Sequence, residues 1–265
     1  MTKPLQSRAV VRRNFMLLEP SGFCRSALPA WPGCTVHILA SPAMGAGFCH
    51  YLITIPPGCG TAKDPAAKAA GGSPEQTFIY CLAGSAVVEL SGVGHAISPG
   101  CYVYMPPDST WSIDAEEQSC KILLFRHPYR SIDGLQAWSA SGEISKLTQE
   151  PQGRIAGSGS FLQAALPEHP AFDLKVNILS FAPGDSHSQI ETHHETHGLY
   201  MLSGEGLYYL DGRWYPVAAG DYMWMGPFLP QAFYATGEDS ASYIYTKEGN
   251  RDIQLPDLDG DRGVS

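Results

Sequence analysis

The sequence has few charged residues and no long hydrophobic segment. Asp, Glu, Lys and Arg make up only 16% of its 265 residues, and the formal net charge is −9. No run of eighteen apolar residues occurs, so we expect no segment that spans a membrane. The negative balance argues against nucleic acid or an anionic membrane as a partner. A hydrophobic content of 44% is enough for a sizeable core, which argues against overall disorder.

Cysteine is absent from the second half of the chain. The seven cysteines lie between Cys24 and Cys120, their number is odd, and no C-x-x-C occurs. This pattern excludes a disulfide framework and a zinc knuckle, and it favours reduced, mostly buried thiols. The first twenty residues contain no apolar core of a secretory signal. We therefore expect a cytoplasmic protein.

Turn-forming residues and short β-rich segments dominate the pattern. The sequence contains 28 glycines and 21 prolines, which punctuate segments such as VNILSF, GLYMLSG, GLYYL and ASYIYT. Such segments, rich in β-branched and aromatic residues, are typical of strands. Asp211-Gly212 between LYYL and RWYPV predicts a hairpin with a type I′ turn. The sequence therefore predicts an all-β fold.

The chain contains an internal repeat. A constant shift of 120 positions aligns three glycines of each copy: Gly84 with Gly204, Gly92 with Gly212 and Gly100 with Gly220. A repeat of this length indicates two copies of one domain. Short strands that close into small barrels leave room for one buried site in each. We expect one barrel in residues 1–130, a connector with a short helix or two in residues 131–170, and a second barrel in residues 171–265.

Three possible metal ligands lie within seven residues of the second copy. Glu191 and His193 are two positions apart, so on a strand both side chains would point to one face, and His197 follows. The spacing from Glu191 to Gly204 is E-x-H-x3-H-x6-G. It resembles the first cupin motif, H-x-H-x3-E-x6-G, with the Glu and one His exchanged. The alternative is that these histidines are surface residues of a polar loop.

The second cupin motif, G-x5-P-x-G-x2-H-x3-N, can be followed from Gly220. It places Gln231 where the last ligand usually stands, while Gly226, Phe228 and Ala235 depart from the pattern. The resemblance implies two tandem cupin barrels of the double-stranded β-helix type, a bicupin. In the first copy the four ligand positions correspond to residues that make poor ligands, so we expect that barrel to be structural and to serve packing and oligomer contact: Gly71, Ser73, Thr77 and Trp111.

The expected ligands are two imidazoles, one carboxylate and one amide oxygen. This set suits Mn²⁺, Fe²⁺ or Ni²⁺ better than structural zinc, and it would favour a small anionic substrate. Tyr208 follows the motif on the next strand. Tyr243 and Lys247 share one face of the last strand by the period of two. They are candidates for binding the substrate and moving protons, unless they are exposed residues at a barrel rim.

The segments SRAVVRRNFMLLEPSGF, ILSFAPGDSHSQIETHHETHGLYMLSGEGLYYLDGRW and SYIYTKEGNRD resemble the (S)-ureidoglycine aminohydrolases, manganese-dependent bicupins of purine catabolism. The resemblance extends from about Ser7 to Ile253. It implies homo-oligomers and the conversion of (S)-ureidoglycine and water to (S)-ureidoglycolate and ammonia. It assigns the metal ligands Glu191, His193, His197 and Gln231 and the substrate contacts Tyr208, Tyr243 and Lys247. Two alternatives stay open: another metal bicupin that decarboxylates or oxygenates a small acid, and a non-catalytic binder of small molecules.

Overall fold

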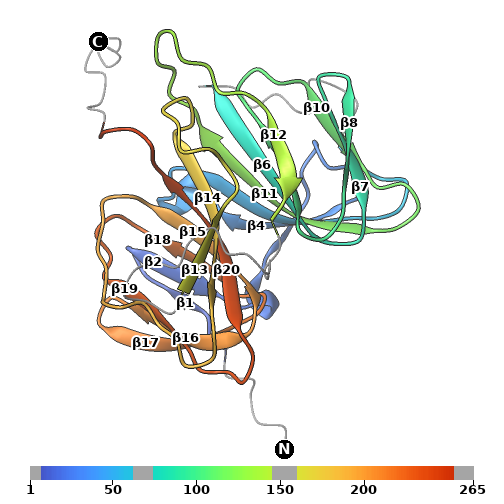
Figure 1. Cartoon of the computed structure of the whole chain (residues 1–265). Helices are drawn as coiled ribbons and strands as arrows, with labels where there is room; N and C mark the ends of the chain where they lie inside the picture. Colours follow the sequence, from blue (N-terminus) through green and yellow to red (C-terminus); the bar gives the residue numbers. More distant parts are fainter. Residues whose placement is uncertain (1–6, 62–73, 145–159, 254–265) are drawn as a thin grey trace, which may run out of the picture.

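The computed structural model describes residues 7–61, 74–144 and 160–253, and these residues form two β-barrels (Figure 1). In each barrel a seven-stranded sheet faces a three-stranded sheet. The described residues include two short 3-10 helices, η1 (Pro20–Gly22) and η2 (Pro42–Met44), and no α-helix. They contain no helix of the length and apolar character that a membrane span requires. The all-β, two-barrel prediction is confirmed.

The N-terminal barrel has the strand order β12-β9-β6-β11-β5-β4-β3 in its large sheet and β10-β7-β8 in its small sheet. Its interior holds a buried cluster of aliphatic side chains that includes Val36, Ile53 and Ile122. The strands of this barrel are β3 (Arg25–Ser26), β4 (Thr35–Ala40), β5 (Cys49–Ile55), β6 (Glu75–Ala83), β7 (Ala86–Leu90), β8 (Val93–Ile97), β9 (Cys101–Met105), β10 (Trp111–Asp114), β11 (Cys120–Pro128) and β12 (Ala140–Glu143).

The C-terminal barrel repeats this arrangement, with β1-β2-β18-β15-β20-β14-β13 in the large sheet and β17-β16-β19 in the small one. Its interior is more aromatic and includes Phe181, Tyr208, Phe233 and Tyr243. The strands of this barrel are β1 (Val10–Val11), β2 (Phe15–Leu18), β13 (Ser160–Ala164), β14 (Leu174–Phe181), β15 (His197–Ser203), β16 (Glu205–Leu210), β17 (Arg213–Ala218), β18 (Tyr222–Met225), β19 (Gln231–Ala235) and β20 (Ala241–Glu248).

The repeat seen in the sequence is also a repeat of backbone conformation. Gly84 and Gly204 have φ angles of 74° and 70°, values that favour glycine. A Cβ on Gly84 would lie 1.8 Å from a backbone oxygen, so this close approach requires glycine as well. The predicted hairpin is present between β16 and β17, where Asp211 and Gly212 both have positive φ, as a type I′ turn requires. These angles confirm the repeat and the turn.

Segments of the expected first barrel (residues 1–130) and of the expected connector (residues 131–170) join sheets outside those ranges. Strands β1 and β2, from within residues 1–130, extend the large sheet of the C-terminal barrel through the pairing of β2 with β18. The reason is the FMLL sequence of β2, whose Phe15 and Leu17 enter the C-terminal barrel core while Met16 packs between the barrels. The helices expected in 131–170 are absent from its described parts, which contain strands β12 and β13. Residues 145–159 lie outside the described residues.

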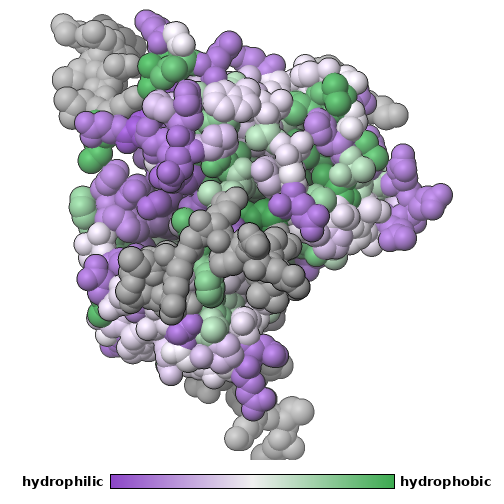
Figure 2. Space-filling model, viewed as in Figure 1, coloured by the Kyte–Doolittle hydropathy of each residue, from purple (hydrophilic) through white to green (hydrophobic). Residues whose placement is uncertain are grey.

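The two large sheets face each other and bury a third cluster of side chains between the barrels. This cluster contains Phe48, Phe125, Tyr200 and Trp224 among others. In the space-filling view, hydrophobic residues also gather over the N-terminal barrel, whereas the left side of the molecule is mainly polar (Figure 2). The barrels are therefore joined by an extensive apolar contact and not only by the connecting chain.

Buried polar groups lie inside this contact. His50 of β5 contacts three polar partners: its Nε2 lies 2.9 Å from Nε2 of His127 and 3.1 Å from Oγ1 of Thr246, and its Nδ1 lies 2.9 Å from the Tyr222 hydroxyl. Phe48 stacks on both imidazoles. Tyr222 and Thr246 belong to the C-terminal barrel, so this cluster fixes the position of the two sheets relative to each other.

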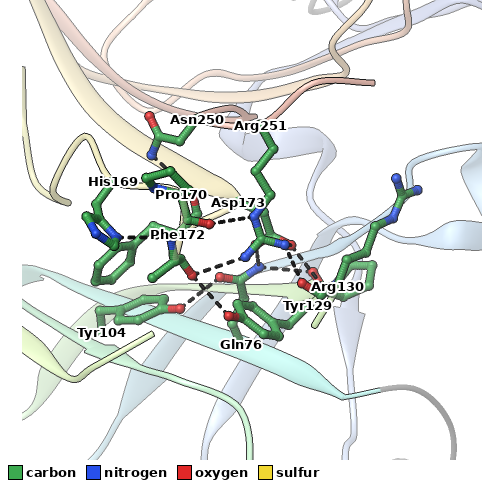
Figure 3. A network of polar contacts seen from close by, with 12 residues as sticks. Gln76, Tyr104, Tyr129, Arg130, His169, Pro170, Phe172, Asp173, Asn250 and Arg251 are labelled. Atoms are coloured by element: carbon green, nitrogen blue, oxygen red, sulfur yellow. Dashed lines mark hydrogen bonds and ion pairs between the residues drawn. The ribbon is translucent and has the colours of Figure 1, made fainter. Parts of the chain in front are cut away.

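A second polar network joins the barrels at the end of β20 (Figure 3). Asp173 accepts hydrogen bonds from the Gln76 side chain at 2.5 Å and from the Arg130 backbone at 2.9 Å. The Arg251 guanidinium lies 3.5 Å from the same carboxylate and donates to the carbonyl oxygens of Pro170 and Ala171. The chain that leaves β20 is therefore tied to β6 and to the end of β11 in the N-terminal barrel.

Candidate functional site

The C-terminal barrel contains a cavity of about 110 Å³ between its two sheets. The seven site residues predicted from the sequence all line it. The volume suits a compact molecule, and the lining combines imidazole, carboxylate, amide, phenol and ammonium groups. The complete lining is Ser160, Leu179, His187, Ser188, Glu191, His193, His197, Leu199, Tyr208, Gln231, Tyr243, Tyr245 and Lys247.

The alternation of β20 divides its side chains between two environments. Tyr243, Tyr245 and Lys247 point into the cavity, as the period of two predicts. The residues between them face the other barrel: Ile244 belongs to the core between the barrels, and Thr246 contacts the buried His50. One strand therefore builds the cavity wall and the contact between the barrels.

Two of the expected ligands lie outside the regular strands. The sequence predicted that Glu191 and His193 share a face of a strand, but the structure places both in the loop before β15. Glu191 forms an isolated backbone bridge with Gln231, with N–O distances of 2.8 and 2.9 Å. The carbonyl oxygen of His193 accepts a hydrogen bond from the backbone N–H of Phe228 at 2.7 Å. These backbone contacts, and not a strand, direct both side chains into the cavity.

The imidazoles of His193 and His197 and the amide of Gln231 lie close together in the cavity. The two rings are 4.2 Å apart between centroids, and Nε2 of His193 lies 2.8 Å from Nε2 of Gln231. The Tyr208 hydroxyl donates to Oε1 of Gln231 at 3.0 Å. A half-turn of the amide would direct Oε1 towards His193 Nε2 and the NH₂ group towards Tyr208. Two acceptor atoms would then face a common point, as a cation requires.

Burial keeps the two imidazoles neutral. Desolvation lowers the pKa of His197 well below 6.5, and the neighbouring His193 and Lys247 lower it further. Desolvation also lowers the pKa of His193, although the charge of Glu195 opposes this shift. A neutral imidazole with a free lone pair is the form that binds metal ions.

The phenols of the cavity stay protonated. Desolvation raises the pKa of Tyr208 and Tyr243 far above 10. Nε2 of His187 lies 3.0 Å from the Tyr243 hydroxyl, and burial lowers the pKa of His187 to about 4. Both phenols are therefore neutral near pH 7 and act through hydrogen bonds, not as phenolate bases.

Sequence reasoning missed two residues that support the predicted ones. Glu195 lies between the two histidines, and its carboxylate oxygens are 3.0 Å from Nδ1 of His193 and 3.5 Å from Nζ of Lys247. His187 holds the Tyr243 hydroxyl. Glu195 lies within the H-x3-H spacing, so its place in the motif was visible. No sequence pattern marked His187, because its partner lies 56 positions away.

The donor atoms fit a metal ion of the kind that prefers nitrogen and oxygen ligands. The described residues contain no ready cluster of three or more His, Cys, Asp or Glu side chains at metal-binding geometry. The chemistry of the set is nevertheless suitable, since a carboxylate, two neutral imidazoles and an amide line one cavity. His197 Nδ1 is buried without a hydrogen-bond partner, so this ring has a polar atom that the protein does not satisfy.

The corresponding positions of the first barrel differ in chemistry. Thr77 is buried on β6, and Trp111 lies on β10 and packs against Trp31. Gly71 and Ser73, the other two positions, lie outside the described residues. Threonine and tryptophan do not provide the donors found in the second barrel. The site chemistry is therefore concentrated in the C-terminal barrel.

Two tandem barrels, of which the second contains a cavity with imidazole, carboxylate and amide groups, define a bicupin. Residues 177–246 match the family model described as Cupin domain. The (S)-ureidoglycine aminohydrolase of Escherichia coli (strain K12) is 38% identical over 95% of both chains. The probable (S)-ureidoglycine aminohydrolase of Oryza sativa subsp. japonica is 32% identical over 93% of this chain and 76% of its own. The chain belongs to the (S)-ureidoglycine aminohydrolase family.

Solved structures agree with this assignment. The crystal structure of the E. coli protein Ylba superposes with a TM-score of 0.81 at 36% identity, covering 95% of this chain and 98% of the other. Oxalate decarboxylase of Bacillus subtilis, a protein with Mn(II) centres, has a TM-score of 0.60 at 11% identity over 94% of this chain and 81% of its own. The second likeness shows the shared fold alone.

Proposed function

We propose that this protein hydrolyses (S)-ureidoglycine to (S)-ureidoglycolate and ammonia, a step of purine degradation, with a divalent metal ion in the C-terminal barrel. The observation that carries the proposal is the convergence of seven residues, predicted from sequence, on one small cavity. Membership of a family of this activity supports the reaction. The small volume and the lysine at the wall support a compact anionic substrate.

Glu191, His193, His197 and Gln231 would hold the metal, and we propose Mn²⁺ because the set contains nitrogen and oxygen donors without a thiolate. When bound, the metal supplies Lewis acidity and a template for the substrate. The protein groups around it have distinct tasks. The Tyr208 hydroxyl orients the Gln231 amide through their 3.0 Å contact.

Lys247 is the cation that would pair with the substrate carboxylate. Its side chain lines the cavity and is 25% exposed, so the ammonium stands where an anion enters from solvent. The phenols of Tyr208 and Tyr243 are neutral and offer hydrogen bonds to the ureido group. Tyr243 is itself held by His187 at 3.0 Å. Contacts to the carboxylate and the ureido group from fixed strands would leave one face of the reacting carbon open to water, which sets the stereochemistry.

The test is the enantiomer of the product, because (S)-ureidoglycine also decays without an enzyme. The substrate would be generated in situ from allantoate and the ureidoglycolate resolved by chiral chromatography. We expect pure (S) product with Mn²⁺, and loss of this stereoselectivity after chelation or in Lys247→Ala. The control is Lys175→Ala. Lys175 lies opposite Lys247 on the neighbouring strand β14 but does not line the cavity. Racemic product at the background rate from the native chain would overturn the proposal.

A further inference from the structure

Glu195 stands between the site and the space between the barrels. Its side chain is only 15% exposed, and it lines a second cavity of about 240 Å³ together with residues of both barrels, such as His127 and Arg251. Its carboxylate points to the other side, towards the groups of the first cavity. A partly buried carboxylate needs partners, because burial without them costs free energy. Glu195 has three: His194, whose Nδ1 lies 3.5 Å from Oε2 and which lines the second cavity, and two that belong to the proposed site.

The first partner is the imidazole of His193. Nε2 of this ring faces Gln231, whereas Nδ1 faces Oε2 of Glu195 at 3.0 Å. The distance is that of a hydrogen bond, although the N–H direction is not aligned with the oxygen. A carboxylate beside Nδ1 favours the tautomer that carries its proton there. The lone pair of Nε2 then points to the cavity side, towards the Gln231 amide, where a cation would be held.

The second partner is the ammonium of Lys247. Oε1 of Glu195 lies 3.5 Å from Nζ, so one carboxylate contacts both groups, one through each oxygen. Partly exposed ion pairs contribute little to stability. A lysine side chain has many rotamers, so a fixed anion mainly restricts where the ammonium stands. The effect of this contact therefore falls on substrate binding more than on the stability of the fold.

The first barrel contains the same pair without the site. Glu75, which corresponds to Glu195 by the shift of 120, forms a salt bridge of 2.5 Å with Arg126. Arg126 and Lys247 occupy corresponding positions of β11 and β20 in their pairing with β5 and β14. A Glu–cation pair is thus part of the repeat. What the second barrel adds is the histidine at the other oxygen of Glu195.

We propose that Glu195 is a positioning residue of this site, which fixes the His193 imidazole with one carboxylate oxygen and the Lys247 ammonium with the other. The contact with His193 is the metal half of this proposal; it concerns metal binding and is independent of the reaction. The contact with Lys247 is the substrate half, which rests on the proposed function. The first barrel provides the matched control, since Glu75→Gln removes the same charge from the same place in the repeat.

The experiment measures Mn²⁺ affinity first. The full chain, stripped with chelator, is titrated with MnCl₂ while the EPR signal of free aqueous Mn²⁺ is followed. We expect Glu195→Gln to weaken binding about 10- to 100-fold, the usual loss when a carboxylate behind a ligating histidine is removed. Glu195→Asp, which keeps the charge on a shorter side chain, should recover part of the affinity. Glu75→Gln should change it less than twofold.

Kinetics at saturating Mn²⁺ then test the contact between Glu195 and Lys247 separately. We expect KM of Glu195→Gln to rise about three- to fivefold with little change in kcat, the size of effect that a partly exposed ion pair allows. The Kd of the product (S)-ureidoglycolate should rise by a similar factor in Glu195→Gln. In a Lys247→Ala background, where selective turnover is lost, the same substitution should leave this Kd unchanged, because the group that it positions is gone. The Mn²⁺ affinity should still fall in that background, because His193 is untouched.

Native Mn²⁺ affinity in Glu195→Gln, with melting temperature equal to that of the native chain, would overturn the metal half. An increase in the Kd of (S)-ureidoglycolate that is equally large in the native and Lys247→Ala backgrounds would overturn the substrate half. If Glu195→Gln folds poorly, the difference between Glu195→Asp and Glu75→Gln decides the same question. A native chain that makes no (S) product would refute the proposed function, while the EPR titration would still decide whether Glu195 positions His193.

Discussion

Acidification should destabilise the protein through the buried histidines between its barrels. His50 and His127 are both buried, and their neighbours are the hydroxyls of Tyr222 and Thr246 and the ring of Phe48. None of these neighbours carries a negative charge near neutral pH. Desolvation lowers the pKa of His50 well below 6.5 and that of His127 to about 3. Each ring is therefore neutral in the folded protein at neutral pH.

Proton linkage gives the sign and the size of this pH effect on the free energy of unfolding. Between pH 6.5 and about 3, the unfolded chain binds a proton at His127 and the folded chain does not. The stability of the fold is therefore unaffected by His127 well above pH 6.5 and decreases as the pH falls, because protons bind to the unfolded chain. The free energy of unfolding should decrease by about 1.4 kcal/mol per pH unit for this one residue. Between pH 6.5 and 4.5 the loss is about 2 kcal/mol, because the unfolded histidine is already half protonated at pH 6.5. This is a large part of the 5–15 kcal/mol typical of a protein.

The assay is urea unfolding of the metal-free chain at several pH values, for the native protein and His127→Gln. Glutamine keeps a hydrogen-bonding group near His50 but does not titrate. Other buried histidines, such as His187, are present in both proteins, so the difference between the two pH profiles isolates His127. We expect a shallower profile for the variant. Parallel profiles would refute the reasoning and would mean that water enters from the neighbouring cavity, which His127 also lines.

Three further outcomes are expected. Gly198→Ala should lower the free energy of unfolding by about 1–3 kcal/mol, since its Cβ would lie 2.3 Å from a carbon of His50. Gly94→Ala is the control, because its Cβ would lie 3.6 Å from the nearest atom and should not lower the stability; thermal melting compares the two variants. Arg8→Ala should cost about 3 kcal/mol in denaturant unfolding, because it leaves the fully buried Asp221 without its cation. Chelation should lower Tm, and Mn²⁺ at 100 times Kd should restore about 2.7 kcal/mol, which calorimetry measures.

The site could be predicted from sequence because its residues lie close together in the chain or at motif spacing. Glu191, His193 and His197 occupy seven positions, and Tyr243 and Lys247 follow the period of a strand. The sequence predicted a strand at Glu191 and His193, whereas the structure has a loop that is held by backbone hydrogen bonds to Gln231 and Phe228. Their convergence on one cavity is a property of the structure. Their roles in binding metal and substrate remain predictions.

The partners of β2 and of His50 could not be predicted, because they depend on contacts between distant segments. Nothing in FMLL indicates that Phe15 and Leu17 will complete the C-terminal barrel and not the barrel that follows them directly. The contact of His50 with Thr246 joins residues 196 positions apart. A strand pattern shows which residues share a face. It does not show which sheet that face will meet.

These contacts connect the barrel with poor ligands to the site of the other barrel. Strand β20 carries Tyr243 and Lys247 on the cavity side and Thr246 on the side of the N-terminal barrel. A shift of the contact at His50 therefore moves the strand that positions Lys247. Substitutions at His50 should change the arrangement of the cavity although no atom of His50 lies in its lining. We therefore expect the first barrel to support the strand that forms the cavity wall.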